Sequence, residues 1–304
     1  MILRYYHTIK FLKITQIFYR LKKILFYKII NLNKNNIKIN LSKNDFYTNQ
    51  FIIKNININI NEGYLNVLNN KINLNHINWN DKNYSKLVIY TLNYFDFLIN
   101  LDDNTEFKKN LIYSWINTNN DHLNTSWEPY PISRRIVNWI KWIKKNKITS
   151  DKIDKSIFLQ TRWLNINVEY DLLGNHILSN AIALVLSGFY FDTFESNKWF
   201  EKGCRILEKE LNRQFLNDGG HFERSTMYHS IIYEDLLDTY NFLNSNELFL
   251  VKNKKKIIRL IKNITFKMYE WQNYMNITKN NLSLFGDAAN SNIIQTNHLF
   301  QYAA

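Results

Sequence analysis

Two short polar segments stand out in this sequence, because each places side chains that could do chemistry at the start of an apolar, helix-like run. The first is Gly174-Asn175-His176, and the second is residues 218–229, with the sequence D-G-G-H-F-E-R-S-T-M-Y-H. The amide and imidazole groups of Asn175 and His176 can bind a carboxylate, and the phenol of Tyr228 can transfer a proton. Together these groups suit β-elimination on an acidic sugar.

A structural role is the simplest interpretation of Asn175 and His176 taken alone, as a helix N-cap and a hydrogen-bonded core histidine. The second segment shifts this balance, because it compresses more polar side chains between a tight turn and an apolar run than packing requires. These side chains include His221, Glu223, Arg224, Tyr228 and His229. If a helix has begun by Arg224, that residue and Tyr228 are i, i+4 neighbours, and the guanidinium lowers the pKa of the phenol.

Metal, nucleotide and serine-hydrolase chemistry find no support in the motifs. The segment from His221 to His229 lacks the H-E-x-x-H spacing that puts two imidazoles on one helix face, and a zinc site needs a third strong ligand. The sequence contains no Gly-rich phosphate loop and no G-x-S-x-G elbow. We therefore predict no metal site and no cofactor.

The composition indicates a globular and mainly helical protein. Hydrophobic residues make up 45% of the 304 residues and charged residues 21%, while only seven Gly and two Pro are available for the turns of an all-β fold. The net charge of +13 attracts polyanions, either nucleic acid or acidic polysaccharide, although lysine enrichment in an AT-rich genome explains it equally well. No RNA-binding or zinc-finger pattern accompanies the charge, so we predict no nucleic-acid partner.

Cys204 is the single cysteine, so we expect no internal disulfide. The first residues interrupt their apolar positions with Lys and Arg and lack the apolar core of a signal peptide, which makes a cytoplasmic location the default expectation. The longest apolar stretch, 181–191, is too short to cross a bilayer, and we predict no transmembrane segment. For residues 1–30, a helix packed on its own domain is favoured over an amphipathic helix pair at a membrane surface.

The elements that must position the two polar segments are mostly helices. Apolar residues at i, i+3, i+4 and i+7 predict helices from residue 86 onward. Their expected ranges are 86–100, 104–117, 133–145, 150–165, 169–190, 196–212, 223–244 and 252–274. Successive antiparallel helices with short loops fit an α/α toroid, in which helix hairpins close around a central cleft. A helical-repeat solenoid stays open as an alternative, although no fixed period is visible.

The first 80 residues differ from the rest. Alternating apolar residues at 52–61 predict a short strand or an extended segment, and the Asn-rich stretches around them predict loops. We therefore expect two parts: residues 1–80, a helix and an irregular segment packed on the toroid, and residues 81–304, the toroid itself.

Five segments together resemble the N-terminal half of the heparinase II/III family of polysaccharide lyases. They are G-N-H-I-L-S-N-A (174–181), residues 218–229, P-Y-P-I-S-R-R-I-V-N-W-I-K-W (129–142), L-N-Y-F-D-F-L (92–98) and F-G-D-A-A (285–289). The resemblance spans nearly the whole chain. It implies a mainly all-α fold, an incomplete α/α toroid of antiparallel helix hairpins, without the C-terminal β-sandwich that follows the toroid in the family.

The same resemblance implies roles for the motif residues. Asn175 would neutralise the carboxylate of a uronate, His176 would assist it or approach the C5 proton, and Tyr228 would protonate the leaving O4. The C5 proton is acidic only when negative charge spreads into the carboxyl group, so donors aimed at that group lower the barrier as an oxyanion hole does. The residues expected to contact the sugar are Arg224, His229, Trp127 and Tyr130.

Some features depart from the family pattern. Ser179 stands where many relatives have an acidic residue, which we expect to bear on substrate choice, and Thr226 stands where many have Pro. In the family a C-terminal β-sandwich contributes a catalytic histidine, and we expect that domain in the full-length protein; His298 cannot replace it. Family members are often periplasmic, which leaves the location open.

The implied function is that of a polysaccharide lyase, of the heparinase or alginate-lyase kind, that cleaves an acidic, uronate-containing polysaccharide by β-elimination. We expect this chain alone to be weakly active or inactive. One alternative is a non-catalytic or truncated carbohydrate-binding toroid protein of surface-polysaccharide metabolism. Another is a toroid glycoside hydrolase with two carboxylates, Glu169 or Asp171 with Asp218 or Glu223. Products separate the enzymes, because only elimination leaves a conjugated double bond.

Overall fold

Helices dominate the structure. The computed structural model describes residues 7, 10–26, 39–42, 58–59, 63–99, 104–244, 254–278, 281–289 and 296–303. Its helices are α2 (Ile14–Phe26), α3 (Lys86–Tyr94), α4 (Thr105–Thr118), α5 (Pro129–Lys145), α6 (Asp151–Ile166), α7 (Gly174–Tyr190), α8 (Phe194–Gln214), α9 (Thr226–Asn244), α10 (Lys254–Met275) and α11 (Thr296–Ala303). Within these described ranges, no helix is both long enough and apolar enough to cross a membrane.

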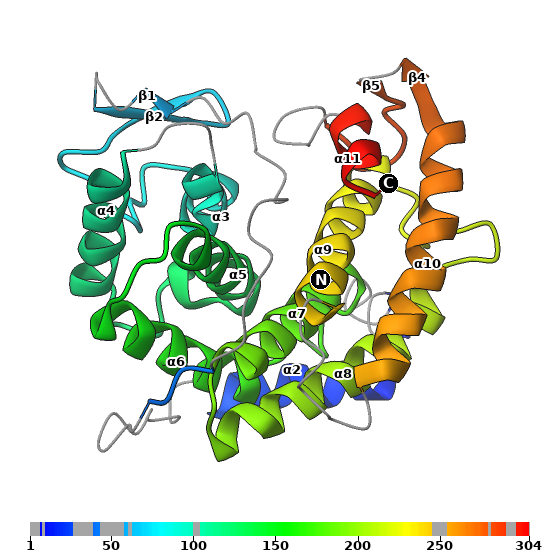
Figure 1. Cartoon of the computed structure of the whole chain (residues 1–304), viewed down its shortest axis with the longest axis horizontal. Coiled ribbons are helices and arrows are strands. Elements are labelled where there is room, and N and C mark those ends of the chain that lie inside the picture. Colours follow the sequence, from blue (N-terminus) through cyan, green and yellow to red (C-terminus); the bar gives the residue numbers. More distant parts are fainter. Residues whose placement is uncertain are drawn as a thin grey trace.

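The helices from α3 to α10 follow an open arc, which Figure 1 shows from one side. Helices α5, α7 and α9 contact one another in that order, while α6, α8 and α10 pack against this row. Each helix of the row is thus followed in the chain by a helix of the second layer. This arrangement is an incomplete α/α toroid, so the prediction of a mainly all-α toroid is confirmed.

Helices α7 and α8 form the most extensive helix contact of the arc. Two glycines permit it. A Cβ atom on Gly203 would lie 2.7 Å from Cγ2 of Val185, and one on Gly188 would lie 2.6 Å from the backbone nitrogen of Phe200. Because α7 is apolar on nearly every side, it is buried along almost its whole length. The first turn of α7 is therefore the end of a rigid, tightly packed helix.

Three helices begin three or more residues away from the predicted positions. Helix α5 begins at Pro129, four residues early, because proline suits the first position of a helix. Helix α7 begins at Gly174 rather than at residue 169, after Leu173 takes a φ of 67°. Helix α9 begins at Thr226 rather than at residue 223, and Arg224 before it has a φ of 55°. The predicted helical pairing of Arg224 with Tyr228 is therefore wrong.

A three-stranded antiparallel sheet, β1 (Ile58–Asn59), β2 (Tyr64–Val67) and β3 (Asn70–Asn73), packs near α3. The β2–β3 hairpin was predicted as loop; its turn residues Leu68 and Asn69 both have positive φ, which matches a tight hairpin turn. Most of the strand predicted at 52–61 lies outside the described residues, and β1 is its described part. Its neighbours β2 and β3 contribute to the same hydrophobic core as the helices. The boundary at residue 80 stays a prediction.

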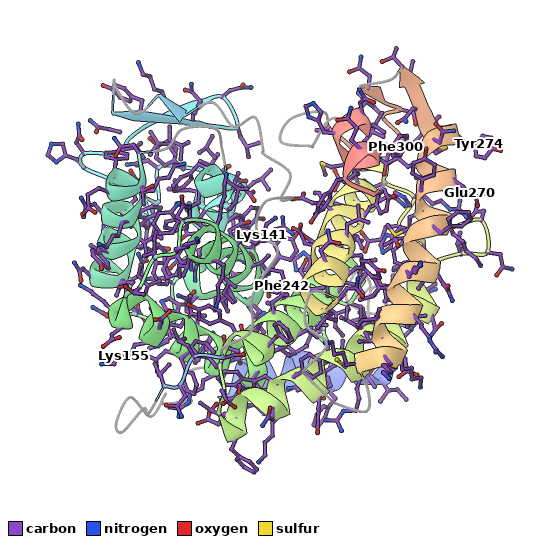
Figure 2. The ribbon with its side chains drawn as sticks, viewed as in Figure 1. Lys141, Lys155, Phe242, Glu270, Tyr274 and Phe300 are labelled. Atoms are coloured by element: carbon purple, nitrogen blue, oxygen red, sulfur yellow. The ribbon has the colours of Figure 1, made fainter. Side chains whose placement is uncertain are left out.

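A row of buried charges joins α5 to α9. Nη1 of Arg134 lies 2.6 Å from Oδ1 of Asp235, and Lys141 pairs with Asp238. The other carboxylate oxygen of Asp238 accepts a hydrogen bond of 2.7 Å from Tyr302 on α11. Figure 2 shows Lys141 between α5 and α9. The four charged side chains are buried, and pairing of this kind is what their burial requires.

Candidate active site at the starts of helices α7 and α9

Glu223 connects the two polar segments. Its Oε1 atom accepts a hydrogen bond of 3.0 Å from the backbone N–H of Asn175, in the first turn of α7. The amino end of a helix attracts a carboxylate, because its first N–H groups have no partner within the helix. The approach is so close that a Cβ atom on Gly174 would lie 1.9 Å from the same oxygen, and Gly174 has a φ of +58°. Glycine at this position is therefore a condition for the contact between the two segments.

His176 lies between a carboxylate and an aromatic ring. Its Nδ1 atom is 3.2 Å from Oε1 of buried Glu169, and its ring centroid is 4.4 Å from that of Tyr130. Asn180 holds Glu169 in place, since its Nδ2 donates to Oε2 at 3.1 Å and its Oδ1 accepts from the Glu169 backbone N–H at 2.9 Å. The side chain of His176 is about one quarter exposed. An oriented imidazole is thus accessible from outside.

Tyr228, on the first turn of α9, completes the group. Its hydroxyl donates a hydrogen bond of 2.5 Å to Oδ2 of Asp287. Burial raises the pKa of Tyr228 well above its ordinary value, and Asp287, Glu223 and Tyr130 raise it further. The predicted lowering of this pKa by Arg224 is wrong, because carboxylates rather than a guanidinium surround the phenol. Tyr228 is therefore a phenol that keeps its proton.

The carboxyl group of Glu223 lies close to Asn175, His176 and Asp287. Burial raises its pKa, Asp287 raises it further, and the Asn175 N–H and His176 oppose the shift. Burial likewise raises the pKa of Tyr130 to about 12, while a hydrogen bond with Ser179 opposes that shift. The site thus gathers groups from α5, α7, the loop before α9, α9 itself and the segment 281–289.

Two predicted sugar contacts lie elsewhere. His229 is fully buried on the side of α9 that faces α10, with Nε2 3.2 Å from the Met268 carbonyl oxygen and its ring 4.3 Å from that of Trp271. Burial lowers the pKa of His229 to about 3. Trp127 is also buried, and its indole N–H donates to the Asn119 carbonyl oxygen at 2.9 Å. Both positions are those of core residues, which corrects the expectation that these side chains face a sugar.

The other two predicted sugar contacts, Tyr130 and Arg224, lie at the edge of the candidate site. Tyr130 is mostly buried and presents its ring to His176, so little of its face is open to a sugar. Arg224 is exposed, and its carbonyl lies close to Gly286 in the segment that carries Asp287. The backbone of Arg224 therefore lies beside the segment of Asp287, and its side chain is exposed.

Three carboxylates of the site were not predicted as parts of a lyase centre: Glu169, Glu223 and Asp287. Glu169 entered only as a candidate for a hydrolase, and Glu223 entered as such a candidate and as one of the polar side chains of the second segment, without a role in elimination. Asp287 belongs to the F-G-D-A-A segment, for which no role was expected. The Gly174 directly before Asn175 is the one local signal that something approaches this backbone closely. Across the ranges that the structure describes, no three His, Cys, Asp or Glu side chains gather as a metal ion would need.

The chain is similar to known lyases. The family model described as the heparinase II/III N-terminus matches residues 5–304. The heparin-sulfate lyase of Bacteroides stercoris is 31% identical over 107 residues, and that of Bacteroides thetaiotaomicron is 30% identical over 132 residues. These alignments cover 33% and 41% of this chain but 16% and 19% of the relatives.

Two solved structures share the fold. The crystal structure of heparinase III has a TM-score of 0.53 at 21% identity, covering 85% of this chain and 44% of that one. A mutant of the heparan sulfate lyase HepC from Pedobacter heparinus has a TM-score of 0.51 at 17% identity, covering 90% and 45%. This chain therefore spans less than half the length of either structure. Because the family model covers nearly the whole sequence, the chain belongs to the heparinase II/III family, whose N-terminal region it represents.

Proposed function

We propose that the full-length protein is a lyase that cleaves a uronate-containing acidic polysaccharide by β-elimination. The observation that carries this proposal is that Glu223 lies close to the backbone N–H of Asn175, to His176 and to Tyr228. Relatives that are heparin-sulfate lyases support a polysaccharide lyase at the level of the family. Heparan sulfate is therefore the first substrate to test.

In the proposed reaction, a uronate carboxylate binds against the start of α7. The Asn175 amide and the His176 imidazole donate hydrogen bonds to it, and Arg224 adds a positive charge at the rim. Negative charge grows on this carboxylate as the C5 proton leaves, so donors placed in advance stabilise the transition state more than the bound substrate. The rigid packing of α7 supports such placement, because the donors need little reorganisation.

Tyr228 then acts as the general acid. The catalytic histidine expected in the C-terminal domain of the full-length protein takes the C5 proton. The electron pair of the C5–H bond forms the double bond between C4 and C5, the C4–O4 bond breaks, and the Tyr228 phenol gives its proton to O4. The raised pKa of Tyr228 supports this role, since the phenol is protonated before the reaction. Asp287, which is exposed, is the acceptor that the leaving oxygen would replace.

The test is an identification of products. Full-length protein is incubated with heparan sulfate and, in parallel, with alginate, and near-ultraviolet absorbance and mass spectrometry report unsaturated ends. Asn175→Ala should slow their release by roughly 10²–10³-fold, the typical effect of losing one oxyanion donor. Saturated products, or unsaturated products at the wild-type rate from Asn175→Ala, would contradict the proposal.

One observation favours a second candidate, a glycoside hydrolase. Both Glu169 and Glu223 lie close to His176, and paired carboxylates are what that chemistry requires. The same incubation decides between the two, because hydrolysis produces new reducing ends without near-ultraviolet absorbance.

A further inference from the structure

Helix α2 packs on the rest of the protein through its polar side. Nε2 of Gln16 donates a hydrogen bond of 3.0 Å to the Asp171 carbonyl oxygen, and Nζ of Lys23 lies 3.9 Å from the Asp171 carboxylate. The ring of Tyr19 lies 4.6 Å from that of Tyr170. Positions 16, 19 and 23 share one side of a helix. This side faces the loop that leads into α7. In Figure 1, α2 lies at the bottom of the view, near α7 and α8.

The opposite side of α2 is apolar and faces solvent. Its residues and their exposed fractions are Ile14 (85%), Phe18 (61%), Leu21 (55%), Ile24 (74%) and Leu25 (62%), and Phe11 just before the helix is 79% exposed. Positions 14, 18, 21 and 25 follow the spacing of a single helical stripe. A surface helix normally buries such a stripe against its own core, so α2 has the reverse orientation.

The sequence segment that contains this stripe carries only positive charges. Ten of the 39 Lys and Arg residues precede Asp45, the first acidic residue of the chain, so residues 1–44 account for ten of the net thirteen positive charges. Lys22 on α2 lies close enough to Lys202 on α8 to lower the pKa of Lys202, which burial, Lys22 and Arg205 together bring to about 8. Like charges held close to one another favour an anionic partner.

We propose that α2 is a membrane-surface helix, which inserts its exposed apolar side into the boundary between headgroups and acyl chains of a bilayer that contains anionic lipid. A large apolar face with flanking Lys and Arg is the combination by which helices lie in such a boundary. Clusters of basic residues add attraction to anionic headgroups. A second copy of the chain is a poorer occupant, because pairing two such helices would bring two strongly basic segments together.

The geometry of the contact follows from the fold. Helix α2 lies in the membrane plane with its polar side still bound to the loop before α7, so the protein docks without giving up the contacts of Gln16 and Tyr19. The arc of helices then stands on the membrane with the start of α7 held at a constant distance from it. The membrane contact is independent of the proposed lyase activity.

The experiment is co-sedimentation of the 304-residue chain with lipid vesicles. Vesicles of phosphatidylcholine with phosphatidylglycerol should retain the protein at low salt, and pure phosphatidylcholine vesicles should retain at least about tenfold less. The triple variant Phe18→Ser, Leu21→Ser, Leu25→Ser should lose at least about tenfold of the binding. Lys22→Gln should lose about fivefold, an effect that vanishes at high salt.

Phe266→Ser is the matched control, since Phe266 is 66% exposed on α10 and far in sequence from α2. This variant should bind vesicles as the wild type does. Equal binding of the triple variant and the wild type would overturn the proposal, as would equal binding to both kinds of vesicle. A dimer of the wild type in lipid-free sedimentation, lost in the triple variant, would overturn it in favour of a second copy. Because the substituted side chains are exposed, unchanged circular dichroism and thermal unfolding should accompany the loss of binding.

Discussion

Helix α9 carries two polar regions that differ in burial and in pairing. At its start, Tyr228 is partly exposed and bonds to the exposed carboxylate of Asp287. Further along, Asp235 and Asp238 are buried and paired with Arg134 and Lys141, respectively. A substrate can replace an exposed partner at low cost, but it cannot reach a buried ion pair. The polar residues of this one helix therefore divide into those open to a ligand and those that hold the arc together.

The largest effect is expected from breaking the buried row. Arg134→Met leaves the buried carboxylate of Asp235 without its cation, and removing one partner of such a pair costs about 3–5 kcal/mol. Chemical denaturation should show this loss in the free energy of unfolding. Arg162→Met is the control, because its pair with Glu195 is partly exposed and such pairs contribute at most about 1 kcal/mol. Equal losses in the two variants would show that burial does not make the α5–α9 pairs more important for stability than an exposed pair.

The next effect tests the exposed region. Tyr228→Phe removes the transferable proton and keeps the ring, so release of unsaturated ends by the full-length protein should fall at least about hundredfold. Stability should change little, because the lost hydrogen bond lies at the surface. Tyr233→Phe, at a buried position on the same helix, should leave turnover unchanged. Wild-type turnover in Tyr228→Phe would remove this tyrosine from the mechanism even though the family stands.

A smaller effect is expected at the contact between the two polar segments, where Glu223 meets the backbone of Gly174 and Asn175. Gly174→Ala introduces a Cβ atom into the position of Glu223 Oε1 at a positive φ, and the backbone strain alone costs about 1–2 kcal/mol. Thermal unfolding should shift downward and turnover should decrease, because the motifs must separate. The double variant Gly174→Ala, Glu223→Ala should recover the steric part and keep the backbone part. A stability of Gly174→Ala equal to that of the wild type would show that Glu223 can move away from this backbone without cost.

The smallest effect on stability is expected from His229, which lies on the side of α9 that faces α10. Its pKa is about 3 in the folded protein and about 6.5 when unfolded. The unfolded state therefore binds more protons between these values, so stability is fully present above about pH 6.5 and falls as the pH drops toward 3. Between pH 7.5 and 5.5 the loss amounts to about 1 kcal/mol. In His229→Phe this part of the loss should disappear, and an unchanged pH dependence would argue against a buried, neutral histidine.

Local patterns were sufficient for the helices but not for their first residues. The 3.6-residue spacing of apolar positions marks a buried face, so the ranges of α4, α6, α8 and α10 were predicted to within two residues at each end. Where a chain enters a helix depends on single residues with unusual backbone angles, such as Leu173 and Arg224. Leucine and arginine rarely adopt positive φ, and at these two positions the surrounding structure holds them there, which no local pattern reports.

The sequence by itself determined the family, the helical arc and the two segments that carry the candidate chemistry, because residue types and short spacings encode these features. Only the tertiary structure decided which side chains of those segments meet. Tyr228 and His229 are neighbours in the chain, yet successive residues point to different sides of a helix, so one joins the site and the other enters the core. The partners Glu169 and Asp287 reach the site through packing between segments far apart in sequence, and that packing depends on the whole core rather than on any motif.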